Sequence, residues 1–539
     1  MSAEAEQRRY VEVVARLGVA NLPPGGRDML EEMVRLVPRD ARLVLDLGCN
    51  TGSVAARVAA EVPAATVVGI DRSPAMIESA RRRYPGTNPS FQVLDVECVG
   101  EAFRDADAAL CGGSSAFFAE RVTSLRAIST ALAPTGVLID AHYVYDPAVP
   151  RDLRKREERS FGVRSPVYSA GECLAPYEVA ELPVQSYIRR DPWQLPDKPE
   201  AAPYRSILAS LPGMAPVVRE MVSRRELIAQ LARHRHPVLV TASLNEAASG
   251  SRSHGVAEAL AVMEFFQEPF PREPMSSLRS MLPYEFLAYV GDPDAAPGGG
   301  AAVKRIASLL SELGVGEAAP VLDVGCFTGL STIILARSFP RVLGVDIDPT
   351  FVRVARALGE RMGSTARFRC MDGAGTQLAA SSQDAYVMTA TLGYTPQPEA
   401  LLAEAMRVVR PGGFLVEFLY HYPIATGAVE RRVRRAVGPD VRVTSLSSQV
   451  EMVERAGFRL VRAERICRQP ARPEFVAAVC AGVIAAERKR NPHLREGDFD
   501  EFAELFRQYV GRVDLGNAEP SVYLCVFARP SQSNGDPDE

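Results

Sequence analysis

Short apolar runs alternate with amphipathic segments along most of the chain. Segments 329–339 and 448–458 carry apolar residues at spacings of three and four, which predicts helices. Runs short enough for buried strands occupy 43–48, 66–71, 91–95, 108–113, 137–143 and 236–244 in the first half, and 321–325, 342–346, 367–371, 385–390, 414–420, 459–466 and 521–530 in the second. Such alternation is typical of parallel sheets covered by helices on both faces. We therefore expect an α/β, doubly wound fold.

The second half of the chain repeats the first. The segment Leu45–Gly52 recurs as Leu322–Gly329, 277 positions later. Pairs at the same interval are Asp95 and Asp372, Asp107 and Asp384, Tyr143 and Tyr420, and Tyr145 and Tyr422. A Pro-Gly-Gly turn precedes an amphipathic segment in both halves, at 24–26 and 297–299. A long internal repeat of this kind indicates a duplicated domain, and we predict two tandem domains with a mostly parallel, seven-stranded sheet each.

Composition places the boundary between the domains near residue 255. Residues 247–255 are rich in Ser and Gly and include Arg252, a composition typical of linkers. We expect domain 1 at 1–255, domain 2 at 256–530 and a disordered acidic tail at 531–539. The first domain has the more irregular tail, with Pro192, Pro196, Pro199 and Pro203, which makes it the candidate for a degenerate member.

Length and charge narrow the class of protein further. At 539 residues the chain exceeds one ordinary core, and 47% hydrophobic with 24% charged residues is typical of soluble globular proteins. The polar start MSAEAEQRRY and the lack of a long apolar run predict a cytoplasmic protein with no membrane role. A net charge of −4 argues against general nucleic-acid binding. The nine cysteines show no spacing suited to zinc or to a disulfide framework.

Each repeat contains a glycine turn that leads from a strand into a helix. The turns read Asp46-Leu-Gly-Cys-Asn-Thr-Gly52 and Asp323-Val-Gly-Cys-Phe-Thr-Gly329. Missing side chains at such a turn let a ligand approach backbone N–H groups at a helix start. A strand-to-helix turn without a ligand is the alternative interpretation.

Acidic residues follow the next two strands of each repeat. Asp71 and Asp346 end the second strand, where one carboxylate can accept hydrogen bonds from both hydroxyls of a ribose. A helix N-cap is the alternative role for each. Asp95 and Asp372 end the third strand and could accept from an adenine amino group.

This order of motifs resembles the class I, Rossmann-like S-adenosylmethionine (SAM)-dependent methyltransferases over nearly the whole of both halves. The resemblance implies that the glycine turn holds the methionine moiety of SAM, that the first acid holds its ribose and that the second meets its adenine. The candidate cofactor-binding residues are Asp46, Gly48, Cys49, Asn50, Gly52, Asp71, Arg72, Asp95 and Val96 in the first half, and Asp323, Gly325, Cys326, Phe327, Gly329, Asp346, Ile347, Asp372 and Gly373 in the second.

The turns depart from the family pattern at one position. The usual middle glycine is Asn50 in the first turn and Phe327 in the second. The GxFTG turn resembles catechol-type O-methyltransferases, whose magnesium ligands have no counterpart in Thr389–Thr391 or Glu417–Leu419, so we expect no metal. A dinucleotide site fits less well, since neither half shows GxGxxG.

Candidate catalytic groups follow the fifth strand of each repeat. Methyl transfer depends mainly on positioning, and histidine suits proton removal near neutral pH. His142 and His421 are candidates, with structural roles as the alternative, and Tyr143 and Tyr420 are candidate substrate-facing aromatics. After the fourth strand, residues expected beside the cofactor are Ser114, Ser115, Phe117, Thr391 and Tyr394.

Three hypotheses follow. The first is a SAM-dependent methyltransferase acting on a small molecule, with a helical insertion before the last strand as a lid. Lysine occurs at only four positions, which is typical of a GC-rich genome and points to bacterial specialised metabolism. The second hypothesis is that one domain catalyses while the other is structural or binds SAM; the third is a SAM-using cyclase or lyase. A homodimer stays open.

Overall fold

The computed structural model of the chain divides into two compact units, Met1–Glu246 and Ala247–Glu539. It describes residues 22–161, 166–191, 227–228, 230–244, 256–291, 298–423, 426–438, 440–466, 473–509 and 520–531. The predicted linker at 247–255, the prolines after the sixth strand and nearly all of the predicted acidic tail lie outside these residues. None of the described helices is long and apolar enough to cross a membrane.

The first unit contains a seven-stranded sheet in the order β3-β2-β1-β4-β5-β7-β6. Strands β1 to β5 pair in parallel, and β7 runs antiparallel between β5 and β6. The strands are β1 (Leu43–Leu47), β2 (Thr66–Asp71), β3 (Ser90–Val93), β4 (Ala106–Gly112), β5 (Leu132–Tyr145), β6 (Val184–Arg189) and β7 (Arg235–Ser243).

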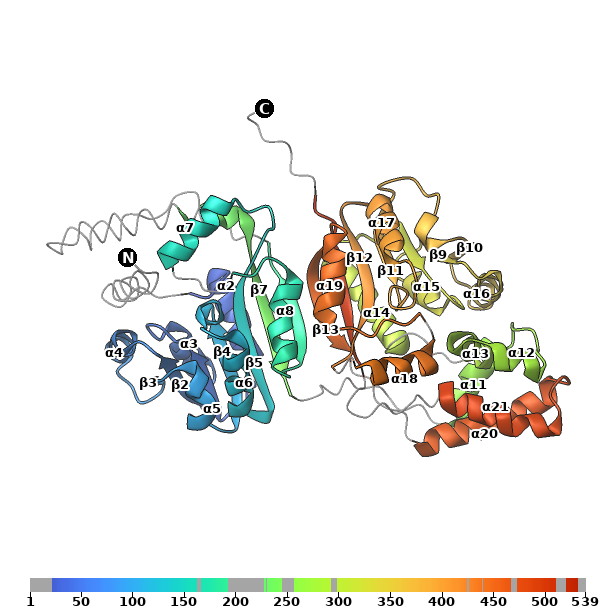
Figure 1. Ribbon diagram of the computed structural model, residues 1–539, viewed down its shortest axis with the longest axis horizontal. Helices are drawn as coiled ribbons and strands as arrows, with labels where there is room; N and C mark the ends of the chain where they lie inside the picture. The colour runs from blue at the N-terminus through green and yellow to red at the C-terminus, as the bar shows by residue number, and fades with distance from the viewer. Residues whose placement is uncertain are drawn as a thin grey trace, which may run out of the picture. The chain divides into compact units, whose positions relative to one another are not determined.

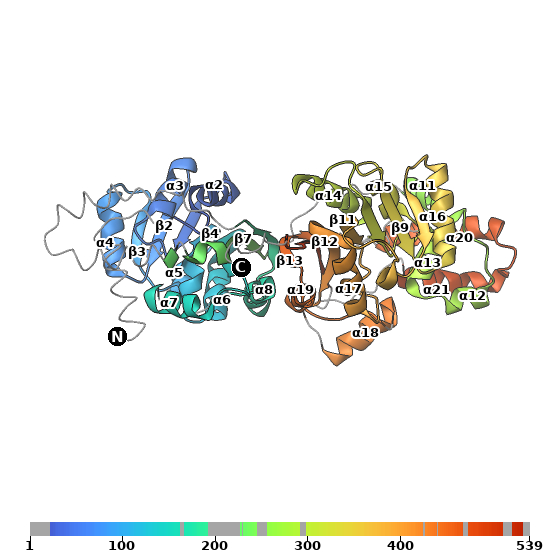
Figure 2. The same cartoon turned by 90° about the horizontal axis from the view of Figure 1, so that it is seen from above.

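Helices cover both faces of this first sheet. They are α2 (Gly26–Leu36), α3 (Ser53–Glu61), α4 (Pro74–Arg83), α5 (Val99–Ala102), α6 (Arg121–Ala131), α7 (Arg151–Phe161) and α8 (Ala170–Val179), with short 3₁₀ turns η1 (Val96–Cys98), η2 (Ser114–Phe117) and η3 (Ala232–His234). Figure 2 shows α2 and α3 on one side of the strands and α5, α6 and α8 on the other. Parallel strands need such crossover helices, and their apolar sides bury the sheet.

The second unit has the same strand order, β10-β9-β8-β11-β12-β14-β13. Its last strand, β14, is antiparallel to both neighbours, as β7 is in the first unit. The strands are β8 (Val321–Val324), β9 (Val342–Asp346), β10 (Arg367–Cys370), β11 (Gln383–Met388), β12 (Val409–His421), β13 (Arg459–Ile466) and β14 (Ser521–Ala528). The prediction of an α/β, doubly wound, Rossmann-like fold in both halves is confirmed (Figure 1).

The helices of the second sheet follow the pattern of the first. They are α14 (Gly299–Glu312), α15 (Leu330–Leu335), α16 (Pro349–Arg361), α17 (Pro398–Val408), α18 (Gly427–Val437) and α19 (Leu446–Arg455), with η4 at Gly373–Gly375. The helix predicted at 329–339 is shorter than expected, because regular α-helical geometry stops at Leu335 and the chain continues in turns to Phe339.

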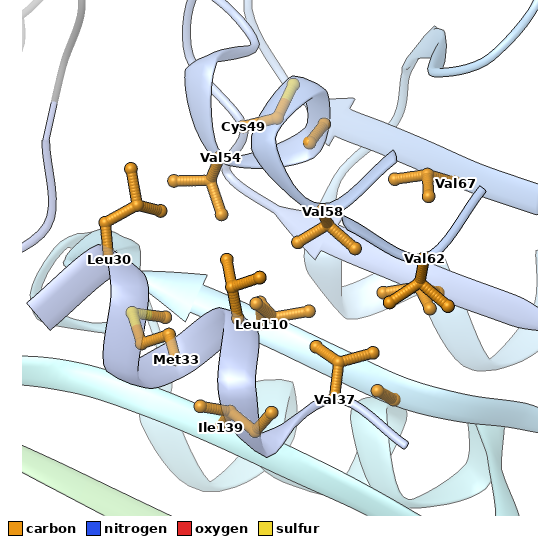
Figure 3. Packing of buried hydrophobic residues seen from close by; sticks show 14 of the residues in the cluster. Leu30, Met33, Val37, Cys49, Val54, Val58, Val62, Val67, Leu110 and Ile139 are labelled. Atoms are coloured by element: carbon orange, nitrogen blue, oxygen red, sulfur yellow. The ribbon is translucent and has the colours of Figure 1, made fainter. Parts of the chain in front are cut away.

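Close packing between α2, α3 and the sheet forms the core of the first unit. Leu30 and Met33 of α2 meet Val54 and Val58 of α3 above Leu110 of β4, as Figure 3 shows. These side chains are at most 6% exposed. Burial of this kind is the main favourable contribution to folding, about 1.5 to 3 kcal/mol for each large apolar side chain.

The second unit adds a helical cluster outside its sheet. Helices α11 (Val256–Gln267), α12 (Met275–Ser280) and α13 (Pro283–Val290) pack with the insertion helices α20 (Pro473–Arg490) and α21 (Phe499–Tyr509), and the 3₁₀ turn η5 (Glu496–Asp498) leads into α21. Buried Glu487 accepts hydrogen bonds from Tyr289 (2.6 Å) and Gln267 (2.9 Å) inside the cluster. The insertion expected as a lid therefore buries much of its apolar surface against the lead-in helices.

Candidate active site

The glycine turns of the two units have the same geometry. Gly48 and Gly325 have φ values of 70° and 69°, in the left-handed region that favours glycine. A Cβ at Gly48 would collide with Ser114, and one at Gly325 with Thr391. Ser114 and Thr391 each donate a hydrogen bond to the carbonyl of the residue just before the turn glycine. The residue after the fourth strand thus locks the turn in place.

The non-glycine residues in the middle of the turns keep this geometry. Asn50 and Phe327 have φ values of 54° and 53°. A left-handed conformation costs a residue such as phenylalanine about 1 to 2 kcal/mol, and such strain collects at functional sites. The Phe327 ring packs on Phe351, with 4.6 Å between centroids. Neither substitution has changed the course of the backbone.

The acids after the second strand fasten these turns from the other side. Asp71 accepts hydrogen bonds from the N–H groups of Asn50 (3.0 Å) and Ser73 (2.8 Å). Asp346 accepts in the same way from Phe327 (2.9 Å) and Asp348 (3.0 Å). Burial raises the pKa of both carboxyl groups, while the backbone donors oppose the rise. The N-caps of the following helices are Ser73 and Asp348, so the alternative role of helix cap falls to the neighbouring residues.

A cavity of about 340 Å³ opens over the glycine turn of the first unit. Its cofactor end is lined by Gly48, Asn50, Asp71, Arg72, Ser73, Met76, Leu94, Asp95, Val96, Glu97 and Ser114. Its far end is lined by aromatic, aliphatic and charged residues, among them Phe117, Phe118, Arg121, His142, Tyr143, Tyr145, Glu157, Ile228 and Arg235. One hollow therefore joins the expected SAM positions to a space for a second molecule.

Several candidate cofactor residues lie behind the turns. Asp46 is 1% exposed and accepts a hydrogen bond from the N–H of Ala55 at 2.9 Å. Asp323 is fully buried and accepts from Ser331 (2.6 Å) and Thr332 (2.7 Å). Both acids tie the strand to the following helix. Burial raises the pKa of Asp46 to about 7 and that of Asp323 to about 6.

Small and aromatic residues support the turns from below. Cys49 and Cys326 are buried in core clusters. A Cβ at Gly52 would lie 2.6 Å from the Phe91 ring, and one at Gly329 would lie 2.9 Å from the Phe368 ring. The same glycine-on-phenylalanine packing thus recurs in both units.

The acids after the third strand cap 3₁₀ turns at the edge of the site. Asp95 accepts from the N–H of Glu97 (3.1 Å), and Asp372 accepts from Ala374 (2.8 Å). Gly373 follows Asp372, and a Cβ there would collide with Val324. Ile347, next to Asp346, is 71% exposed, which is unusual for an isoleucine.

His142 is held by two donors in the wall of the first cavity. Its Nε2 lies 3.2 Å from an Arg121 nitrogen and 3.2 Å from the Cys173 sulfur, and its Nδ1 lies 3.4 Å from the Tyr143 carbonyl oxygen. Because arginine only donates, Nε2 must be the acceptor, and Nδ1 carries the proton. Burial and the Arg121 charge lower the pKa of His142 to about 4. This arrangement disfavours the role of general base, since the accepting nitrogen is already occupied.

Tyr143 and Tyr145 lie in the last residues of β5, rather than after the strand as expected, and contact a buried ion pair. The Arg235 guanidinium lies 4.3 Å from the centre of the Tyr143 ring and donates to Glu157 at 3.2 Å. Tyr145 donates to the same Glu157 oxygen at 2.6 Å. Burial raises the pKa of Glu157 despite these donors. The Glu157 carboxyl is therefore a titratable group inside the cavity that the sequence motifs did not indicate.

The corresponding region of the second unit is built differently. His421 accepts a hydrogen bond at Nδ1 from the N–H of Leu446 (3.2 Å), at the start of α19. Tyr420 and Tyr394 pack edge to face, 6.4 Å between centroids. Glu417 is fully buried and accepts from the N–H of Leu392 at 3.4 Å. Burial raises the pKa of Glu417 well above the usual value for a glutamate.

Comparison of the sequence with protein-family models gives one match in each half of the chain. A methyltransferase-domain family model matches residues 44–136, and a second methyltransferase-domain model matches residues 322–416. The chain carries two methyltransferase domains. S-adenosylmethionine is the cofactor of such domains, and the backbone turns, the acids Asp71 and Asp346 and the cavity over Gly48 are compatible with it.

Curated relatives cover only part of the chain. The uncharacterized methyltransferase YodH of Bacillus subtilis is 28% identical over 156 residues, which are 29% of this chain and 66% of that protein. A trans-aconitate 2-methyltransferase of Methylobacterium radiotolerans is 38% identical over 108 residues, 20% of this chain and 40% of its own. The chain thus spans less than two thirds of the length of these relatives.

Two solved structures match the chain at low identity and low TM-score. Phosphoethanolamine N-methyltransferase 2 of Haemonchus contortus matches 96% of this chain and 99% of its own, at 12% identity and a TM-score of 0.35. The [4+2]-cyclase SpnF matches 44% and 84% of the two chains, at 19% identity and a TM-score of 0.33.

Proposed function

We propose that the protein is a SAM-dependent methyltransferase acting on a small molecule and that its first domain holds a complete site. The observation that carries this is the cavity of the first unit, which runs from Gly48 and Asp71 to Tyr143 and Arg235. SAM held over the turn would leave the second space of the same cavity for a substrate, and methyl transfer depends chiefly on placing the two molecules side by side. Bacterial specialised metabolism, a cytoplasmic location and a homodimer stay predictions from the sequence.

The SAM-binding stoichiometry tests this proposal. Calorimetric titration of the whole chain is expected to give close to two SAM sites. Asp71→Ala should remove one of them and Asp346→Ala the other, because each carboxylate fastens its turn and is the residue that the family resemblance assigns to the ribose. Release of S-adenosylhomocysteine in the presence of a substrate then distinguishes methyl transfer from a cyclase or lyase that uses SAM without consuming it.

The alternative is that only one domain catalyses. A stoichiometry near one that Asp346→Ala abolishes and Asp71→Ala leaves intact would support a degenerate first domain and overturn our proposal. The opposite result would leave the second domain as the structural member. In that domain, the side chain of Phe327 occupies the place of the turn's middle glycine, so the second site is the more altered of the two.

A further inference from the structure

Arg121 is a buried cation in the cavity of the first unit with unused hydrogen-bonding capacity. It begins α6, its side chain is 10% exposed and it lines the far end of the cavity. Among the described residues, its Nε has no acceptor. A guanidinium carries five N–H donors, and leaving one unpaired in a buried place costs about 1 to 3 kcal/mol.

The acid nearest to Arg121 does not neutralise it through a hydrogen bond. The closest approach to Asp140 is 3.8 Å, longer than a hydrogen bond. Asp140 is fully buried and has other donors, Ser115 at 2.7 Å and Tyr177 at 2.6 Å, one for each carboxylate oxygen. Arg121 in turn donates to His142, which is a neutral group. The Arg121 guanidinium is therefore held by His142, by the Tyr177 ring at 5.5 Å and by the Asp140 charge at 3.8 Å, but among the described residues no carboxylate accepts a hydrogen bond from it.

The second arginine of the cavity differs in this respect. Arg235 donates to Glu157 at 3.2 Å and covers the Tyr143 ring. The charge of Arg235 is thus balanced by the Glu157 carboxylate. Of these two far-end arginines, Arg121 is the one without a hydrogen bond to a carboxylate and with a buried Nε that has no acceptor among the described residues.

We propose that the first domain binds a small molecule with one carboxylate group and that Arg121 recognises this carboxylate. A planar carboxylate matches the planar donor face of a guanidinium. Asp71, Asp95 and Glu157 also line the cavity, and these acids would repel the double charge of a phosphate more strongly. The apolar wall formed by Phe117, Phe118 and Ile228 suits the rest of an aryl or alkyl acid. This inference rests on the proposed function, because it names the substrate class of the same site.

The duplication provides an internal comparison. At the 277-residue interval, Asp140 corresponds to Glu417, but Arg121 corresponds to Pro398 and His142 to Leu419. The second domain thus keeps a buried acid but has neither an arginine nor a histidine at the positions that correspond to Arg121 and His142. We expect the preference for a carboxylate to belong to the first domain alone.

Binding of matched probes to the whole chain tests the proposal. With saturating S-adenosylhomocysteine present, 3-phenylpropionate should bind at pH 7 at least about tenfold more tightly than 3-phenylpropionamide, since a hydrogen bond to a charged group contributes about 1.5 to 3 kcal/mol. Arg121→Gln should remove this preference, and Arg121→Lys should retain part of it. Arg126→Gln, on the exposed side of the same helix, is the matched control and should leave the preference intact.

The outcomes separate this inference from the proposed function. Equal binding of acid and amide, no binding of the acid at millimolar concentration, or a preference that survives Arg121→Gln would each overturn it. Titration of S-adenosylhomocysteine into every variant reports on the cofactor site and on folding independently. If the unaltered chain does not bind S-adenosylhomocysteine, that result contradicts the proposed function instead. If Arg121→Gln does not fold, the reduced preference of Arg121→Lys decides.

Discussion

At the scale of single residues, the two cofactor turns show how a departure from a family pattern can be absorbed. Asn50 and Phe327 adopt the left-handed conformation that a glycine would supply, and an aspartate accepts the N–H of each. The hydrogen bond helps to offset the cost of the conformation. The conformation of the turn therefore depends less on the residue type at this position than on the acid that accepts its N–H. That acid is Asp71, 21 positions after Asn50, and Asp346, 19 positions after Phe327.

Ile347 is an exposed apolar residue beside the expected cofactor site of the second unit. It is 71% exposed beside Asp346, so it contributes little to folding of the free protein. Covering about 40 Å² of it with adenine would contribute about 1 kcal/mol. Ile347→Ser should therefore weaken SAM binding at the second site about fivefold in calorimetry, with no change in melting temperature.

A matched control comes from the first unit. Val179 is 55% exposed at the end of α8 and does not line the cavity, so Val179→Ser should leave SAM binding unchanged. A clearly lower melting temperature of Ile347→Ser would show that the Ile347 side chain contributes to folding rather than to cofactor binding.

At the scale of elements, the sequence predicted what local pattern and covalent order determine. The glycine turns, their acids and every strand except β6 follow from apolar runs and fixed spacing. The arrangement of Arg121, Asp140, His142 and Tyr177 did not follow, because α6, β5 and α8 bring these residues together from far apart in the chain. One signal was available, since Asp140 is a charged residue inside the apolar run 137–143.

The same signal marks β12 in the second unit, where Glu417 interrupts the apolar run 414–420. The fully buried carboxyl has a raised pKa, so the folded domain binds a proton that the unfolded chain releases above about pH 4.5. The stability of the domain should fall as pH rises from 4.5 toward that raised pKa. Glu417→Gln cannot titrate, and its melting temperature relative to the unaltered protein should increase between pH 5 and pH 8 by several degrees.

Glu404 provides the control, because its pKa is shifted in the opposite direction from that of Glu417. Its hydrogen bonds from Arg407 and Thr376 lower its pKa to about 2. It is ionised in both the folded and the unfolded chain over most of this range, so Glu404→Gln should change the melting temperature by a nearly constant amount from pH 5 to pH 8. Differential scanning calorimetry reads both variants. A constant difference for Glu417→Gln as well would mean that Glu417 is ionised inside the strand.

At the scale of the whole molecule, the duplication extends from sequence to side-chain contacts. Both units use the same strand order, the same glycine-on-phenylalanine packing and the same hydroxyl that holds the turn. The units differ where a substrate would bind, because the buried acid of the fifth strand is accompanied by Arg121 and His142 in the first unit only. Duplication has therefore kept the cofactor machinery and changed the adjoining space.

Each unit has its own complete sheet and its own buried core, so we expect each to fold without the other. Met1–Glu246 and Ala247–Glu539 expressed separately should both be monodisperse and melt cooperatively, because no strand of either sheet is missing from its unit. The first fragment should bind SAM with the affinity of the Asp346→Ala whole chain, since both keep only the first site. Circular dichroism and calorimetry measure these properties. Aggregation of one fragment, or an affinity for SAM far below that of the whole chain, would mean that the domains depend on each other. The differences between the two sites would then be features of one shared enzyme rather than of two independent binding domains.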